Sequence, residues 1–300
     1  MKILIAGGSG FLGSHLTKSL TADSHQVWIL SRSQKQIQGA TWTHWDGKTI
    51  QGWGALINEM DVVVNLTGLS LSSWPWTKRK KQRFHDSRVE PGHALVSAIE
   101  AASHKPEVFV QTSGINHYGL RGEGIADEST RPADDYLAQL TVAWEEATKS
   151  VESLGVRRVI CRTAVVLAGD ALLLRLMALP ARLFFGGKLG QGDQALPWIH
   201  IRDQVDAIKF LIQNQDTKGA YNLIAPQATS NMEFMRALAN ALHRPFWFHV
   251  PAFLLRTVLG EMSVTITEGR FVTSKRLLEA GYRFNFPNLD DALRDLFNEN

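Results

Sequence analysis

Short apolar runs alternate with longer stretches of helical period through the first half of the chain. The runs predict β-strands at Lys2–Ala6, Gln26–Leu30, Asp61–Leu66, Glu107–Thr112 and Arg157–Arg162. The third of them is apolar without alternation, as a strand covered by helices on both faces should be. Helices are expected at Phe11–Thr21, Lys78–Ala102 and Tyr136–Leu154. This alternation predicts an α/β fold with a Rossmann-type, doubly wound parallel sheet.

The pattern changes after about Val166. The segment Gly186–Gly192 predicts a glycine-rich loop, and strands are expected at Trp198–Ile201 and Gly219–Ile224 with a helix at Gln204–Gln213 between them. Two further helices are expected at 231–242 and 290–297. We therefore expect a Rossmann domain at 1–165, to which 198–225 return. Residues 166–197 and 226–300 would form a smaller, discontinuous C-terminal substrate or lid domain.

Composition narrows the class of protein. The chain has 300 residues, 44% hydrophobic and 20% charged, with a net charge of +3 and interspersed acids and bases. This is the composition of a globular protein. The basic cluster Lys78–Lys81 is interpreted as a solvated helix start, so no nucleic-acid partner is expected. Cys161 is the only cysteine, which excludes an intrachain disulfide and a cysteine-based metal site, and no metal is expected.

Targeting signals are also missing from the sequence pattern. The apolar stretch Met1–Ala6 is too short for a signal peptide, and no segment approaches the length that spans a membrane. We therefore expect a cytoplasmic protein with no membrane partner.

Three glycines follow the first predicted strand and open the first predicted helix. Gly7, Gly10 and Gly13 have the spacing G-x-x-G-x-x-G, one residue longer than the common dinucleotide fingerprint. Glycine permits a tight turn and close backbone approach, and the N–H groups at the helix start face phosphate charge. The alternative is a purely structural strand-to-helix turn. The residues predicted to hold the phosphates are Gly7, Ser9, Gly10, Phe11, Leu12 and Gly13.

The end of the second predicted strand indicates which dinucleotide binds. An NAD site usually places an acid here, on the ribose 2′-hydroxyl. This chain instead has Ser31 and Arg32, which suit a 2′-phosphate through charge-assisted hydrogen bonds, with Lys35 assisting. We therefore predict NADP(H) as the cofactor.

Two more segments follow strands that end at the same edge of the sheet, where open α/β sheets bind ligands. In the first, Leu66 and Thr67 precede Gly68, which lets the backbone pass close to the adenosine and ribose. In the second, Thr112 and Ser113 follow the fourth strand, and Ser113 is expected to hydrogen-bond a substrate oxygen beside the nicotinamide. The alternative is that both segments only cap the next helix or turn.

Several short motifs carry a resemblance to a known family. They are Ser87-Arg88, Trp144-Glu145, the glycines of 186–192, Trp198-Ile199-His200, Ala225-Pro226, Leu259-Gly260-Glu261 and Leu278-Glu279-Ala280-Gly281. Together with the glycine loop they resemble the extended short-chain dehydrogenase/reductase superfamily, which includes nucleotide-sugar epimerases and dehydratases. More narrowly they resemble the atypical "epimerase family protein" subgroup, which has a C-terminal domain of unknown function. The resemblance implies an NADP(H) site contacted by Ser31, Arg32, Leu66, Thr67 and Arg88.

The usual catalytic pair of that superfamily, Tyr-x-x-x-Lys, is absent. A tyrosine titrates near pH 10 unaided, and a neighbouring lysine cation lowers its pKa toward neutrality. None of the four tyrosines has a lysine four residues later. Tyr136 is the positional candidate, with Leu140 in place of the lysine, and Tyr118 is the alternative. The predicted catalytic residues are therefore Ser113, Tyr118 and Tyr136.

Four other polar residues each have two interpretations. His117 is either a proton carrier or a structural residue, and His200 is either a buried structural histidine or a substrate contact. Arg270 and Lys188 either meet a substrate phosphate or carboxylate, or are simply exposed.

Three functions remain open. The first is an NADP(H)-dependent oxidoreductase acting on a small carbonyl or hydroxyl compound. The second is epimerisation or dehydration of a nucleotide-linked sugar with a retained cofactor. The third is a non-catalytic, NADP(H)-responsive binding protein. A small-molecule substrate is the expected partner, and a homodimer through the helices at 78–102 and 136–154 would suit the superfamily.

Overall fold

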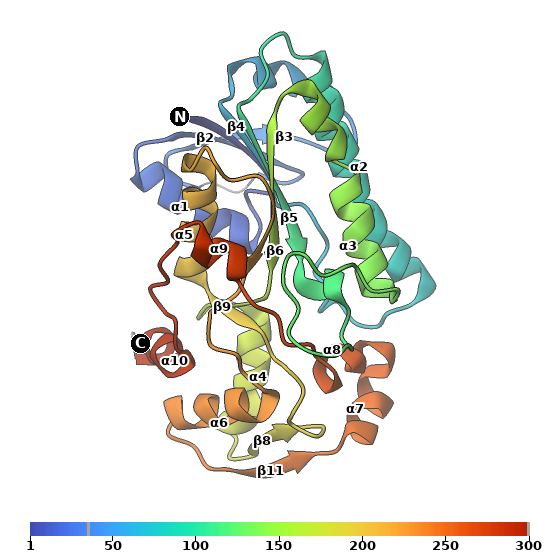
Figure 1. Cartoon of the computed structure of the whole chain (residues 1–300), viewed down its shortest axis with the longest axis vertical. Coiled ribbons are helices and arrows are strands. Elements are labelled where there is room, and N and C mark those ends of the chain that lie inside the picture. Colours follow the sequence, from blue (N-terminus) through green and yellow to red (C-terminus); the bar gives the residue numbers. More distant parts are fainter. Residues whose placement is uncertain (35–36, 299–300) are drawn as a thin grey trace.

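Seven parallel strands form the central sheet of the protein (Figure 1). The structure is a computed structural model, and it describes residues 1–34 and 37–298. In spatial order they are β3 (Ala40–His44), β2 (Gln26–Ser31), β1 (Lys2–Ala6), β4 (Val62–Asn65), β5 (Val108–Gly114), β6 (Arg157–Thr163) and β10 (Gly219–Leu223). Every neighbouring pair is parallel. The predicted doubly wound α/β fold is confirmed. Edge strand β3 was not predicted, because it is half-exposed and has no apolar run.

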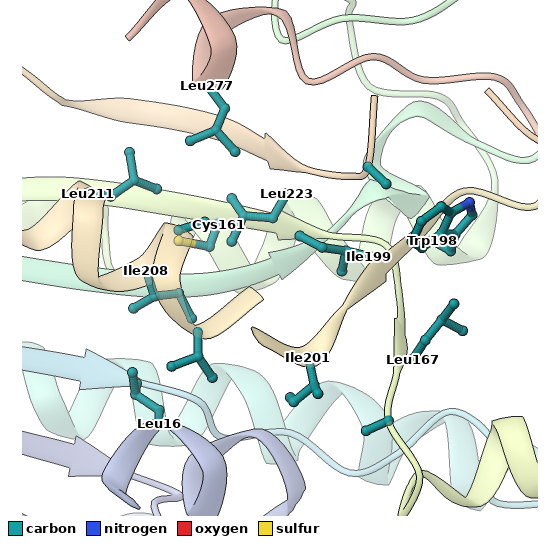
Figure 2. Packing of buried hydrophobic residues seen from close by; sticks show 14 of the residues in the cluster. Leu16, Cys161, Leu167, Trp198, Ile199, Ile201, Ile208, Leu211, Leu223 and Leu277 are labelled. Atoms are coloured by element: carbon teal, nitrogen blue, oxygen red, sulfur yellow. The ribbon is translucent and has the colours of Figure 1, made fainter. Parts of the chain in front are cut away.

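Helices cover both faces of this sheet. On one face lie α1 (Phe11–Ala22) and α5 (Ile201–Gln213), and on the other α2 (Lys78–Ala101), α3 (Tyr136–Glu146) and the 3-10 helix η1 (Gly54–Glu59) (Figure 1). Successive side chains of β1 point to opposite faces of the sheet. Ile3 and Ile5 pack in the same core as Leu16 of α1, whereas Leu4 packs with residues of α2 on the other face. Figure 2 shows the first core, where Ile208 and Cys161 lie between sheet and helices. Burial on both faces explains the near-continuous apolar runs.

The predicted helix at Tyr136–Leu154 is wrong in its second half. Helix α3 ends at Glu146, and a 3-10 helix η3 (Lys149–Leu154) follows. The guanidinium of Arg158 donates to the Glu145 carbonyl at 2.6 Å, and the Thr148 hydroxyl donates to the same carbonyl at 3.3 Å. These side-chain donors occupy the carbonyl that a continuing helix would use.

The part of the chain after β6 builds smaller elements. A two-stranded sheet pairs β7 (Val165–Leu167) with β9 (Trp198–His200), and another pairs β8 (Gly186–Leu189) with β11 (Phe246–Val250). Helices α4 (Leu172–Arg182) and α6 (Asn231–Ala241) pack beside them. The remaining elements are α7 (Ala252–Leu259), the 3-10 helix η4 (Gly260–Ser263), α8 (Val264–Thr267), α9 (Lys275–Glu279) and α10 (Leu289–Asn298).

The loop predicted at Gly186–Gly192 is a strand in its first four residues. A Cβ atom on Gly187 would lie 1.7 Å from the Phe248 carbonyl oxygen, so glycine here permits two strands to approach closely. The domain division at residues 165 and 225 stays a prediction, although β10 does return to the central sheet beside β6.

The later elements are tied to the carboxyl-end edge of the sheet. The Asn222 amide donates to the Thr273 carbonyl at 2.9 Å, Arg121 pairs with Glu268, and Lys81 of α2 pairs with Glu261 of η4. These links place the C-terminal segments against the end of the sheet where ligands of this fold class bind. In the described ranges, no helix is both long and apolar enough to cross a membrane.

Candidate functional site

The glycine loop follows β1, at the point where the strand order of the sheet reverses. Strands β2 and β3 lie on one side of β1, and β4 lies on the other. Gly7 has a φ of +79°, and a Cβ atom there would lie 3.1 Å from the Leu66 carbonyl oxygen at the end of β4. A Cβ atom on Gly13 would lie 2.4 Å from the Gly7 carbonyl oxygen. Both positions therefore require glycine, and the close packing brings the start of α1 to the edge of the sheet.

The first turn of α1 offers an open set of N–H donors. Gly10 caps the helix and has no side chain to accept from it, so Phe11, Leu12 and Gly13 begin the helix without a side-chain cap. Ser9 lies in the turn before the cap. Unsatisfied N–H groups and the positive end of the helix dipole favour an anion such as a pyrophosphate.

At the end of β2, the side chains of Ser31 and Arg32 differ in their hydrogen bonding. The Ser31 hydroxyl donates to the Ser33 carbonyl at 2.8 Å and accepts from the Trp42 indole of β3 at 2.9 Å. Its proton is therefore already in use. Arg32 is exposed and has neither a hydrogen bond nor an ion pair within residues 1–34 and 37–298. Lys35, expected to assist, lies outside the described residues.

Arg88 is a buried cation beside the end of β4. It is 6% exposed, donates to the Phe84 carbonyl at 3.0 Å, and its guanidinium carbon lies 4.7 Å from the Trp144 ring centre. Gly68 lies against it, because a Cβ atom there would be 3.4 Å from that carbon. Burial lowers the pKa of Arg88 to about 10, so it stays charged at neutral pH. In the part of the chain that the structure describes, no carboxylate pairs with it, and a buried unpaired charge is costly unless a ligand supplies the counter-charge.

Side chains at the ends of β4 and β5 are linked to one another. The Thr67 hydroxyl donates to Asn65 at 2.6 Å, Asn65 donates to Gln111 at 3.0 Å, and Gln111 donates to the Thr112 carbonyl at 2.6 Å. The Thr112 hydroxyl is buried and has no hydrogen-bond partner among the described residues. A ligand oxygen or nitrogen beside it would satisfy a group that is otherwise orphaned.

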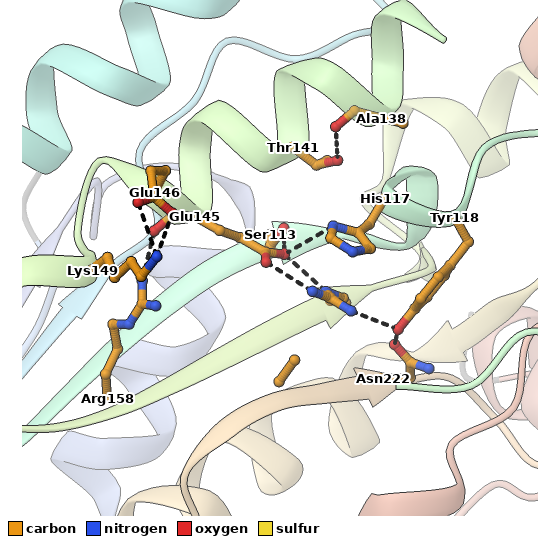
Figure 3. Close-up of polar contacts among 12 residues, drawn as sticks. Ser113, His117, Tyr118, Ala138, Thr141, Glu145, Glu146, Lys149, Arg158 and Asn222 are labelled. Carbon is orange, nitrogen blue, oxygen red and sulfur yellow. Dashed lines mark hydrogen bonds and ion pairs between the residues drawn. The ribbon is translucent and has the colours of Figure 1, made fainter. Parts of the chain in front are cut away.

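A buried polar network surrounds Ser113 (Figure 3). Its hydroxyl donates to Glu145 Oε1 at 2.7 Å, and Arg162 donates to both oxygens of that carboxylate at 2.9 and 2.8 Å. Burial alone would raise the pKa of Glu145. The hydrogen bonds and charge of Arg162, together with the Ser113 hydrogen bond, outweigh burial and leave the pKa below its usual value. Glu145 is therefore ionised at neutral pH.

The two predicted catalytic tyrosines have occupied hydroxyls. Tyr118 is fully buried, donates to Asn222 at 2.7 Å and accepts from Arg162 at 2.9 Å. The Tyr136 hydroxyl donates to the Lys81 carbonyl at 3.3 Å. Burial raises the pKa of both tyrosines. Neither has the lowered pKa that a neutral-pH acid or base requires.

The face of α3 that meets β5 carries no lysine. One turn before Glu145 stands Thr141, whose hydroxyl donates to the Ala138 carbonyl of its own helix at 2.8 Å. A Cβ atom on Gly114 would lie 3.7 Å from the Thr141 methyl group, which places this face against the end of β5. The structure therefore brings Ser113 together with a carboxylate and a guanidinium, and not with a tyrosine and a lysine.

Sequence reasoning quoted Glu145 only as part of a motif, and it missed Arg162 and Asn222 altogether. The available signal was a charged residue at the end of an apolar strand run, in Val159–Arg162. A charge in such a place needs a partner, although the sequence does not say which.

The four residues with two interpretations are all in contact with protein groups. The neutral ring of His117 is buried, with Nδ1 3.8 Å from Glu145 Oε1. His200 is buried, stacks on Phe286 at 3.9 Å and lies 3.2 Å from Asp295. Arg270 donates to the Tyr118 and Glu123 carbonyls, and Lys188 donates to the Gln191 carbonyl. These contacts favour structural roles for His200 and Arg270.

Comparison with known proteins gives matches over the whole length. Residues 3–223 match the NAD dependent epimerase/dehydratase family, and residues 250–296 match a domain of unknown function, DUF1731. The epimerase family protein SH2119 of Staphylococcus haemolyticus is 38% identical over 98% of both chains. YfhF of Bacillus subtilis is 34% identical over 99% of this chain and 98% of that one. The crystal structure of human epimerase family protein SDR39U1 with NADPH has a TM-score of 0.91 and 30% identity, covering 99% of each chain.

Replacing Gly13 by alanine tests the loop. The new methyl group would meet the Gly7 carbonyl oxygen, so the turn must shift, and we expect NADPH affinity to fall about 10–100-fold. Gly169→Ala is the matched control, because its nearest neighbour is 3.7 Å away. Calorimetric titration of NADPH into the two variants makes the comparison. Equal affinities would show that the turn does not hold the cofactor.

The pH dependence of stability tests the burial of His117. Burial, with the charge of Arg162, lowers the pKa of His117 to about 4, against 6.5 when exposed. The unfolded chain therefore takes up a proton first as pH falls. This contribution to stability is complete above pH 6.5 and lost as pH falls toward 4, by about 1–3 kcal/mol. Urea unfolding at several pH values should show a steeper loss for the native chain than for His117→Gln, and parallel curves would contradict this.

Proposed function

This chain belongs to the NAD dependent epimerase/dehydratase family, and from that premise we propose that it is an NADP(H)-dependent oxidoreductase acting on a small carbonyl or hydroxyl compound. One observation carries the proposal. Two arginines near the glycine loop, Arg32 and Arg88, have no carboxylate partner in the described residues, and one of them is buried. The NADPH in the structure of the human relative supports the same cofactor.

The residues fit the parts of NADP(H) by their charge. The N–H groups at the start of α1 suit the pyrophosphate, and Arg32 suits the 2′-phosphate because its guanidinium is exposed and pairs with no carboxylate in residues 1–34 and 37–298. Ser31 is a weaker phosphate donor than expected, because its hydroxyl proton serves the Ser33 carbonyl. Arg88 adds a second positive charge beside Leu66, Thr67 and Gly68. When bound, the cofactor supplies or accepts a hydride at its nicotinamide ring.

Ser113 is the group best placed to handle the substrate oxygen. Its proton lies toward the ionised Glu145, so the Oγ lone pairs are free to accept a hydrogen bond from a substrate hydroxyl. In the reducing direction the same hydroxyl can rotate and donate to a carbonyl oxygen. Arg162 holds the carboxylate in place through two hydrogen bonds. The raised pKa values of Tyr118 and Tyr136 leave Ser113 as the leading candidate of the three predicted residues.

A second candidate function is a non-catalytic, NADP(H)-responsive binding protein. The α3 face toward β5 favours it, because this face presents Thr141 and Glu145 to the end of β5 and carries neither a tyrosine nor a lysine. Epimerisation or dehydration of a nucleotide sugar also needs a proton donor comparable to a tyrosine beside a lysine. The face of α3 that meets β5 has no such pair, so it does not favour this function. Net oxidation of NADPH by a substrate distinguishes the first function from both others.

Two further expectations are carried as proposals. A reducing compartment such as the cytoplasm suits a sequence whose single cysteine, Cys161, can form no intrachain disulfide. Homodimerisation through α2 and α3 remains our proposal for the assembly.

Arg32→Ala tests the cofactor preference. Loss of the charge-assisted hydrogen bonds should weaken NADPH binding about 10–100-fold while leaving NADH binding unchanged. Arg283→Ala is the control, because Arg283 is also exposed and has no hydrogen bond or ion pair among the described residues. Calorimetry with both cofactors measures the ratio. Tighter binding of NADH than NADPH by the native chain would overturn the assignment.

Ser113→Ala tests the chemistry once a screen of aldehydes, ketones and alcohols finds turnover. Removal of the hydroxyl should lower kcat about 10²–10³-fold with little change in NADPH affinity. Tyr136→Phe should retain turnover, because the lost hydroxyl only meets the Lys81 carbonyl. NADPH absorbance follows both reactions. Full activity of Ser113→Ala would remove it from the mechanism, and no turnover in a broad screen would favour the binding-protein function.

A further inference from the structure

Helix α4 has two apolar faces, and only one of them is buried. Leu174, Ala178 and Ala181 pack into the core. Four other leucines form what we call the leucine stripe, and they are Leu172, Leu176, Leu179 and Leu183, each between 50% and 62% exposed. Their spacing of four, three and four residues places them on a single face of the helix and its last turn. A second apolar face on a helix is normally covered by another apolar surface.

An aromatic cluster continues the exposed surface past the end of α4. It comprises Phe184, Phe185, Trp247 and Phe248, all exposed. Phe185 and Trp247 each meet the Phe248 ring, at 5.9 and 5.8 Å between centres, and the Trp247 indole donates to the Phe184 carbonyl at 2.9 Å. Pairing of β11 with β8 joins the two segments. The next helix, α7, buries none of its residues, and Phe253 is 69% exposed.

The charged residues within this surface are basic. The segments that build it are residues 171–192 and 234–260, and each holds three Lys or Arg and no Asp or Glu. The whole chain, by contrast, has 32 basic and 29 acidic residues. Arg175 and Arg182 flank the leucine stripe, and Arg244 lies 4.8 Å from the Phe184 ring centre. Acids stand only at the ends of the two segments, at Asp170, Asp193, Glu233 and Glu261, so cations outnumber anions next to the exposed apolar side chains. An apolar surface with an excess of cations is complementary to an apolar partner that carries anions.

We propose that the leucine stripe and the aromatic cluster bind the surface of a membrane that contains anionic lipids. Leucine and aromatic side chains would enter the region between headgroups and acyl chains, with arginines at the level of the phosphates. Tryptophan with a satisfied N–H suits that boundary. Contact of this kind needs no spanning helix. A second copy of the chain fits less well, because a twofold contact over the leucine stripe would bring Arg175 and Arg182 of one copy close to the same arginines of the other.

The position of the surface is compatible with cofactor binding. Figure 1 places α4, β8 and β11 together at the lower end of the molecule, whereas α1 and β2 lie above them. Membrane contact would therefore leave the glycine loop and Arg32 uncovered. The inference does not rest on the proposed oxidoreductase function, because none of its residues belongs to that site.

Vesicle sedimentation with the full chain tests the proposal. The native chain should bind vesicles of phosphatidylglycerol and phosphatidylcholine, with weaker binding at high salt and to phosphatidylcholine alone. Leu176→Gln should lower the partition coefficient about tenfold. Leu278→Gln on α9 is the matched control, because this helix leucine is also exposed (44%) but lies outside the surface, and it should bind as the native chain does. Arg175→Gln should lower binding to the anionic vesicles about fivefold and leave the weak binding to neutral vesicles unchanged.

Thermal unfolding and NADPH titration of each variant confirm that the fold is intact. Absence of native-chain binding to anionic vesicles overturns the proposal, and so does equal loss in Leu176→Gln and Leu278→Gln. Light scattering tests the competing explanation, that the surface is a contact between two copies of the chain. A concentration-dependent dimer that Leu176→Gln dissociates would assign the surface to a second copy of the chain and overturn membrane binding.

Discussion

The buried ion pair between Glu145 and Arg162 organises the functional end of this protein. It joins α3 to β6, and the side chains of Ser113 and Tyr118 are both hydrogen-bonded to it. Through Tyr118 it reaches Asn222, which holds the Thr273 carbonyl of the C-terminal segment. Breaking such a pair by removing one partner typically costs about 3–5 kcal/mol, because the other charge is left buried. The ion pair and its hydrogen bonds thus connect the sheet, helix α3 and the C-terminal segment.

The same ion pair explains why the pKa of Tyr118 is not lowered by the arginine beside it. A cation near a tyrosine lowers its pKa when the positive charge is not neutralised. Arg162 does touch the Tyr118 hydroxyl, but its charge is already balanced by both oxygens of Glu145. Burial then dominates, and the pKa of Tyr118 rises. A serine in contact with an ionised carboxylate is what remains at the end of β5, and it can exchange hydrogen bonds with a substrate oxygen without ionising itself.

Sequence patterns predicted the parts of the structure that depend on local order. Apolar runs identified six of the seven sheet strands, and glycine spacing located the loop between β1 and α1. Strand β3 was missed because its pairing with β2 stabilises residues that lack an apolar run. The Glu145–Arg162 pair joins residues 17 apart on different elements, so no periodicity reveals it. Helix α4 was missed as well, since the exposed leucines beside its buried face obscure the helical period.

Unpaired positive charge connects stability with function in this fold. Burying Arg88 without a carboxylate destabilises the chain on its own, and its lowered pKa reflects that cost. An anion that binds only the folded state offsets this cost by mass action. At a free concentration a hundred times its Kd, it raises the free energy of unfolding by about 2.7 kcal/mol. An anionic ligand beside Arg88 would therefore supply the counter-charge that the described residues do not. Replacing Arg88 by a neutral residue of similar shape would therefore remove both the cost of the buried charge and the means of holding an anion beside it.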